Sequence, residues 1–172
     1  MGRKRGFMKK YDKIKSHSTT IPVDRTIGTI EKMLANHGVT KIQKDYGPDS
    51  IPCKLVFLIQ EGDGSNKPFE TYPVKIPVNI DGMLEAFKQQ VSEGLLSKKY
   101  MELPWAREQA ARVAWRNALE LIELLLWHVY LKQADLKEVF LPWIYSEELD
   151  TTMYEYIEKK GFNLKALPVG KQ

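Results

Sequence analysis

The chain has 172 residues, of which 43% are hydrophobic and 28% are charged, and this composition is typical of one soluble globular domain. Its apolar runs are far shorter than the roughly 18 residues that a membrane span needs, and a single cysteine cannot form an intramolecular disulfide. Lysines also interrupt the position at which a secretion signal would become apolar. We therefore expect a cytoplasmic protein with no membrane partner.

Positive charge is concentrated at the amino-terminal end. The formal net charge is +4, but residues 1–15 contribute +6 and the remaining residues −2. Residues 1–20 also lack apolar periodicity, so we predict a flexible basic arm. Its basic side chains are Arg3, Lys4, Arg5, Lys9, Lys10, Lys13 and Lys15. Each can neutralise one phosphate, so nucleic acid is the expected partner, while a tail that only improves solubility is the alternative.

The first half of the chain predicts one helix and three strands. Apolar residues at three-to-four spacing indicate a helix that Asp24 or Thr26 caps and that ends at His37-Gly38. Alternating apolar patterns and turn residues then predict strands at residues 39–46, 51–60 and 69–78. Two prolines in the third segment lack amide donors, which places that strand at an edge of the sheet.

The second half predicts helices. Asp81 is placed to cap a helix that extends to about residue 95. Shorter helices are predicted at 134–140 and 151–160, and the longest helix covers 105–132. This longest helix carries an apolar stripe that should organise the core, made of Ala111, Trp115, Ala118, Ile122, Leu125 and Val129.

Together these elements predict an α+β fold: an N-terminal helix, a three-stranded antiparallel sheet, and three or four helices packed on one face of the sheet. We expect a single domain over 21–165 and a frayed C-terminus over 166–172. On the polar side of the longest helix, Arg112 and Arg116 fall in a row with acidic residues at four-residue spacing, which predicts ion pairs within the helix. The two arginines are also the expected secondary contacts to nucleic acid.

No group of residues predicts catalysis. The three histidines are far apart in sequence, and no Cys/His spacing matches a zinc site. We expect Cys53 to be a small buried strand residue, and Glu120 and Glu123 to be solvated on the polar helix face. The sequence therefore predicts no catalytic residue, no metal site and no cofactor, which disfavours a hydrolase or a nuclease.

Aromatic residues are dense late in the chain, and core packing explains most of them. Trp143 and Tyr145 follow directly after Pro142. They are candidates for an exposed platform that binds a protein or a base.

Several stretches between about residues 20 and 145 carry a resemblance to other proteins. They are Ile21-Pro22-Val23, Thr29–Leu34 with His37-Gly38, Ile76–Gly82, Arg107–Arg116 and Glu138–Pro142. These stretches resemble a family of small uncharacterised proteins encoded by tailed phages and prophages. The resemblance implies a phage or mobile-element setting and no catalytic residues. The basic arm lies outside it.

Two functions follow as hypotheses. The first is a non-enzymatic nucleic-acid-binding accessory protein of phage DNA metabolism, which binds phosphates through the arm. The second is a module that binds or inhibits a host protein through the region of Trp143 and Tyr145. Neither hypothesis specifies an oligomeric state.

Overall fold

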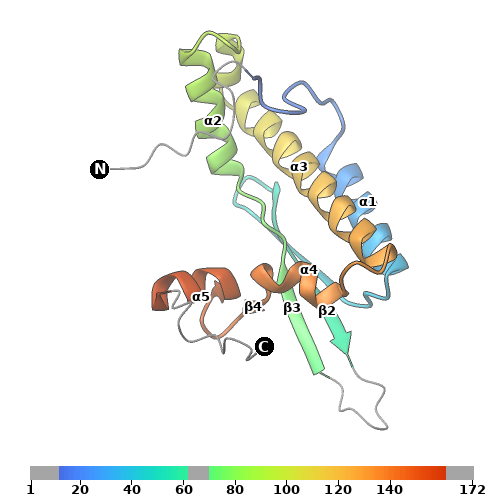
Figure 1. The fold of residues 1–172 in the computed structure, drawn as a ribbon. Helices are drawn as coiled ribbons and strands as arrows, with labels where there is room; N and C mark the ends of the chain where they lie inside the picture. The colour runs from blue at the N-terminus through green and yellow to red at the C-terminus, as the bar shows by residue number, and fades with distance from the viewer. Residues whose placement is uncertain (1–11, 62–69, 162–172) are drawn as a thin grey trace, which may run out of the picture.

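The computed structural model describes residues 12–61 and 70–161, and it confirms the α+β architecture (Figure 1). The order of elements is α1 (Val23–Asn36), β1 (Ile42–Tyr46), β2 (Pro52–Glu61), β3 (Glu70–Lys75), α2 (Ile80–Ser92), α3 (Trp105–Tyr130), α4 (Leu136–Phe140), β4 (Tyr145–Ser146), β5 (Thr151–Thr152) and α5 (Met153–Lys160). Short 3-10 turns precede α3 at Lys98–Met101 and follow α4 at Leu141–Trp143. No helix within the described ranges is both long and apolar enough to cross a membrane.

The three main strands form an antiparallel sheet in the order β1-β2-β3. Phe57 on β2 lies between Ile42 on β1 and Val74 on β3 in register. Because side chains alternate along a strand, these residues share one face, and they pack in a cluster with buried residues of α1 and α3. The predicted edge position of the third strand is confirmed, and an isolated bridge from Val74 to Ile144 covers part of that edge.

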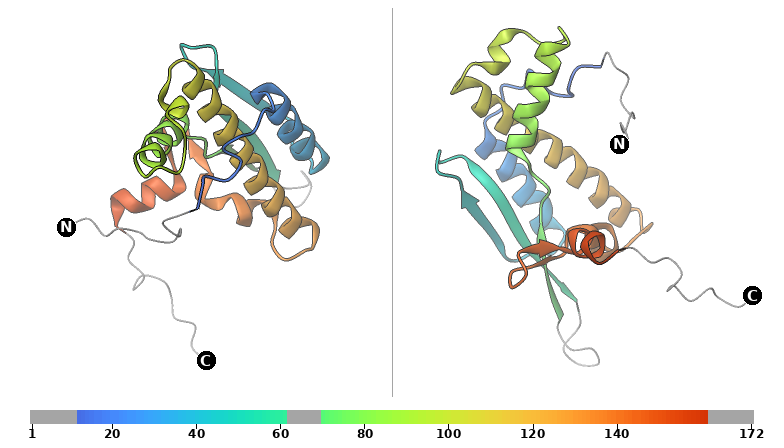
Figure 2. Two further views of the ribbon diagram at one scale, coloured as in Figure 1. Left: turned by 90° about the horizontal axis from the view of Figure 1, so that it is seen from above. Right: turned by 90° about the vertical axis from the view of Figure 1, so that its left-hand side faces the viewer.

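Helix α3 contributes residues to both hydrophobic clusters of the core. The predicted apolar stripe is buried in its central part, where Trp115 is fully buried and its indole nitrogen donates to the carbonyl oxygen of Pro52 at 2.8 Å. The first half of α3 is buried on a second side as well, where alanines pack against Phe87 and Ile80 of α2. Figure 2 shows α3 between α1 and α2, so its two buried sides join two hydrophobic clusters.

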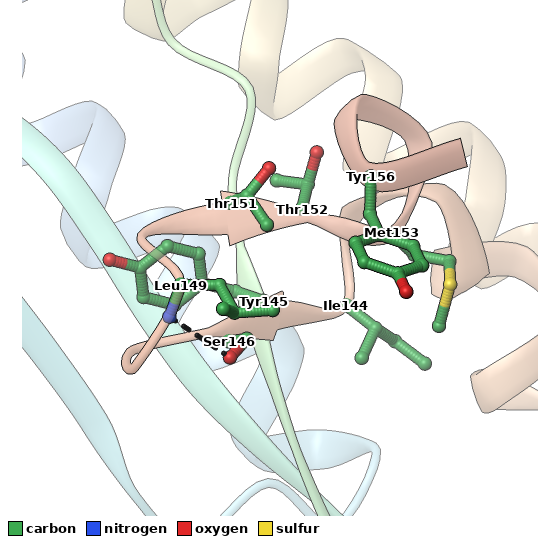
Figure 3. Close-up of a pocket in the computed structure, with 8 residues that line it drawn as sticks. All are labelled: Ile144, Tyr145, Ser146, Leu149, Thr151, Thr152, Met153 and Tyr156. Carbon is green, nitrogen blue, oxygen red and sulfur yellow. Dashed lines mark hydrogen bonds between the residues drawn. The ribbon is translucent and has the colours of Figure 1, made fainter. Parts of the chain in front are cut away.

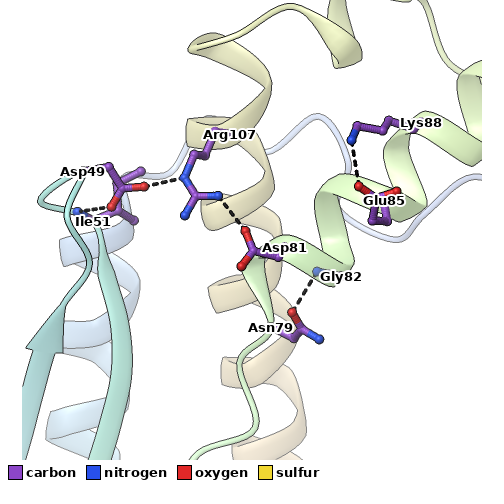
Figure 4. A network of polar contacts seen from close by, with 8 residues as sticks. All are labelled: Asp49, Ile51, Asn79, Asp81, Gly82, Glu85, Lys88 and Arg107. Carbon is purple, nitrogen blue, oxygen red and sulfur yellow. Dashed lines mark hydrogen bonds and ion pairs between the residues drawn. The ribbon is translucent and has the colours of Figure 1, made fainter.

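Arg107, near the start of α3, forms ion pairs with two other segments (Figure 4). Its guanidinium donates to Asp49 in the loop between β1 and β2, and to Asp81 on α2 at 2.7 Å. The hydrogen bond from Arg107 is the main reason why the pKa of Asp49 lies below its ordinary value. The backbone amide of Ile51 lowers the pKa of Asp49 further. The predicted cap of α2 is therefore wrong: Asp81 pairs with Arg107, and Asn79 accepts the capping bond from the Gly82 amide at 2.7 Å.

Two further expectations are corrected. Helix α1 begins after Pro22 without a side-chain cap, and the Thr26 hydroxyl is buried and donates back to the Pro22 carbonyl. Cys53 is exposed rather than buried. The register shifts between Asp45 and Tyr46, so Cys53 is the extra residue of a bulge and leaves the alternation of β2.

Candidate functional site

Residues 12–20, named here the strap, lie against the folded domain. The Ile14 side chain packs with the cluster between α2 and α3, and its amide donates to the Gln90 side chain at 3.1 Å. Gln90 in turn donates to the carbonyl oxygen of Asp12 at 2.8 Å. In the left view of Figure 2 the strap is the dark blue segment that crosses α3.

A buried glutamine on α3 anchors the strap. Gln109 is only 3% exposed, and its amide nitrogen donates to the carbonyl oxygens of His17 at 2.8 Å and Thr19 at 2.9 Å. The Tyr100 hydroxyl also donates to the His17 carbonyl, at 3.2 Å. Because an unsatisfied amide is costly to bury, these bonds require the strap to be in place. The predicted flexible arm over 1–20 therefore does not hold for residues 12–20, while residues 1–11 lie outside the described ranges.

The strap brings one arm lysine to the helix that carries the predicted arginines. The ammonium group of Lys15 lies 2.6 Å from one carboxylate oxygen of Glu120, and Arg116 contacts the other oxygen at 3.3 Å. One turn earlier, Arg112 donates to Gln109 at 3.3 Å and lies 3.8 Å from Glu108. We call Lys15, Arg112 and Arg116 the basic strip. The predicted intrahelical ion pairs of the two arginines are thus confirmed, and Lys15 joins them.

The charge of Glu120 is stabilised by its neighbours. Its side chain is 23% exposed, and burial alone would raise its pKa. The hydrogen bond and charge of Lys15, followed by the charge of Arg116, outweigh the burial and bring the pKa of Glu120 below its ordinary value. Glu120 is therefore ionised at neutral pH, and it is half-buried beside the basic strip rather than fully solvated.

Of the other cations that the sequence predicts as phosphate contacts, the structure describes one. Lys13 is exposed on the strap. Five further arm residues lie outside the described ranges, namely Arg3, Lys4, Arg5, Lys9 and Lys10.

Two adjoining cavities surround Trp143 and form a second candidate site. One, of about 500 Å³, lies between α2 and α3, and the other, of about 640 Å³, lies between the chain after β3 and α5. Both are lined by Pro77, Asn79 and Trp143, so we treat them as one groove and call it the Trp143 groove. The α2–α3 part is mainly apolar, with Met83 and Ala86 in its wall.

Of the two residues predicted to form an exposed aromatic platform, only Trp143 is partly accessible. Trp143 is half-buried and packs edge-on against Phe140. Tyr145 is 5% exposed, so it cannot serve as an exposed contact. Its hydroxyl donates to Asp150 at 2.6 Å, and the Lys54 ammonium lies 4.7 Å from the centre of its ring. The short β4–β5 hairpin holds this side chain against the sheet, as Figure 3 shows, and packing explains Tyr145.

A smaller cavity, of about 240 Å³, lies beside the hairpin. Figure 3 draws the residues that line it. Leu149 and Tyr156 line it, and both are exposed. The sequence pattern did not indicate this surface, because two-residue strands are too short to show alternation.

Sequence reasoning also missed Gln109. A signal was present, since this polar residue stands among alanines on a helix, between Ala106 and Ala110. Such a side chain must be hydrogen-bonded when its neighbours are buried. Its partners are about 90 residues away in sequence, and no local pattern identifies them.

Nothing in the described geometry points to metal-dependent chemistry. Within residues 12–61 and 70–161, no three His, Cys, Asp or Glu side chains gather closely enough to hold a metal ion. Searches against protein-family models, curated proteins and solved structures each find no match to this chain.

Replacing Gln109 with alanine should release the strap. The variant loses both hydrogen bonds to the strap carbonyls, so we expect a loss of roughly 1–3 kcal/mol in the free energy of unfolding, measured in urea. Amides in the turn at His17 and Thr19 should exchange faster with solvent. Gln89→Ala, at an exposed position on α2, is the control and should change neither quantity. Unchanged exchange of the strap in Gln109→Ala would contradict the anchoring.

Proposed function

We propose that the protein is a non-enzymatic nucleic-acid-binding accessory protein of phage or mobile-element DNA metabolism. It binds the phosphate backbone through its basic N-terminal residues and through the basic strip on α3. The observation that carries the proposal is the position of Lys15, which the strap holds beside Arg116. Lys15 lies only four residues after residues 1–11, which carry the other arm cations of the proposal. The phage setting comes from the sequence resemblance.

The distribution of charge supports the same partner. Residues 1–11 hold five basic side chains and no acidic one, whereas the described residues hold 18 basic and 21 acidic side chains. A polyanion is therefore attracted to the N-terminal end and not to the body as a whole. Binding of this kind is sequence-independent and weakens steeply as salt rises.

A second candidate function is a protein-interaction module, and the Trp143 groove favours it. The groove is concave, and its α2–α3 part is lined largely by apolar side chains. Tyr154 is exposed where it lines the other part. Exposed aromatic residues beside apolar concave surfaces are common anchors in protein interfaces. The partner in this proposal is a host or phage protein.

The nucleic-acid proposal is tested by replacing the five basic residues of 1–11 with glutamine in the full-length chain. Binding of a labelled oligonucleotide is titrated over a range of salt. Each lost phosphate contact reduces the slope of log K against log salt by about 0.7 to 0.9, so the slope should fall by about three to five.

A matched variant controls for the loss of net charge. It carries glutamine at five exposed lysines of the body, which are Lys32, Lys41, Lys98, Lys132 and Lys159. This variant should keep most of the slope. Equal effects of the two variants would show that net charge alone matters, and full binding by the arm variant would overturn the proposal.

The groove proposal is tested by filling the groove. Ala86 lines its apolar part, so Ala86→Arg should block a bound segment while it leaves the core intact. Proteins that co-purify from host lysate after nuclease treatment should be lost in this variant and retained in Glu85→Arg, which alters the exposed neighbouring position. A partner that binds Ala86→Arg and Trp143→Ala as well as the parent chain would count against the groove.

A further inference from the structure

Glu120 holds a position whose two cationic neighbours also suit a phosphate. Two cations from separate segments meet its two oxygens: Lys15 from the strap at 2.6 Å and Arg116 from α3 at 3.3 Å. A phosphodiester offers the same arrangement of two charged oxygens, and both lysine and arginine are common phosphate ligands. We infer that Glu120 is a built-in competitor that occupies the phosphate subsite formed by Lys15 and Arg116. This inference rests on the proposed nucleic-acid function and adds regulation of that site.

The contact is of the kind that a ligand can displace. The Lys15 side chain is 76% exposed and the Arg116 side chain is 35% exposed, so solvent and salt screen both pairs with Glu120. Exposed pairs of this kind contribute little to stability. A phosphate that approaches from solvent therefore meets two cations, Lys15 and Arg116, whose ion pairs with Glu120 are weak.

The helix fixes the backbone of Glu120, so its carboxylate stays close to the subsite. Glu120 lies in the middle of α3, and its side chain is half-buried between the strap and the helix. When a phosphate binds Lys15 and Arg116, the carboxylate stays beside it and repels it. The carboxylate therefore lowers the affinity of this subsite for every phosphate-containing ligand. Phosphate binding by Lys15 therefore competes with its ion pair to Glu120.

The other anchors of the strap do not depend on this ion pair. Gln109 and Tyr100 hold the His17 carbonyl, and Gln90 holds the chain at Asp12 and Ile14. Lys15 can thus exchange Glu120 for a phosphate while the backbone of the strap stays docked. The contacts between domain side chains and the strap backbone preorganise the subsite, and Glu120 sets how readily a phosphate binds there.

The inference is tested by comparing Glu120→Gln with Glu123→Gln in the full-length protein. Both remove one negative charge from α3, but Glu123 is exposed one turn further along. Glutamine keeps the shape and the helix propensity of glutamate, and circular dichroism confirms folding. With a labelled oligonucleotide, Glu120→Gln should bind at least about fivefold more tightly than Glu123→Gln at low salt. Its salt slope should be larger by about one to two, because one or two cations become available.

A second variant assigns the gain to the subsite. Adding Lys15→Gln should remove most of the gain in the Glu120→Gln background and should change binding less in the parent chain. Equal affinities of Glu120→Gln and Glu123→Gln, with salt-dependent binding by the parent chain, would overturn the competitor role alone. No salt-dependent binding by any variant would overturn the proposed function and the inference with it.

Discussion

The buried amide of Gln109 is the interaction on which the functional geometry depends. Its nitrogen binds two carbonyl oxygens of the strap, and its oxygen accepts a hydrogen bond from Arg112. A carboxamide buried among alanines is tolerated only when its donors and its acceptor are satisfied. The same side chain therefore fixes the course of residues 12–20 and orients the first arginine of the basic strip.

The two-sided burial of α3 makes this arrangement possible. One side of the helix packs on the sheet and α1, the other packs on α2, and the strap crosses the part that remains. Rigid packing around Trp115 holds the helix, so the charged row that ends at Glu120 has a defined position. The charge of Lys15 and the charge on the helix thus belong to one surface, although they are about 100 residues apart in sequence.

Local pattern explains what the sequence could and could not predict. The helices and the three main strands follow apolar periodicity, and the proline within β3, Pro73, correctly indicates an edge strand. The exposure of Cys53 depends on a bulge in the pairing of β1 with β2, and the burial of Tyr145 depends on a hairpin with two-residue strands. Helical periodicity also places Arg112 and Arg116 in one row, but the approach of Lys15 to that row depends on long-range hydrogen bonds between Gln109 and the strap, which no periodicity reveals.

The most direct measurement of the central claim is a chemical-shift map of the isotope-labelled full-length protein titrated with a short oligonucleotide at low salt. We predict that the largest changes among the described residues fall on the strap and on the turns of α3 that carry Arg112 and Arg116. Added salt should reverse these changes. Changes that concentrate around Trp143 instead, or no salt-sensitive change at all, would contradict the account.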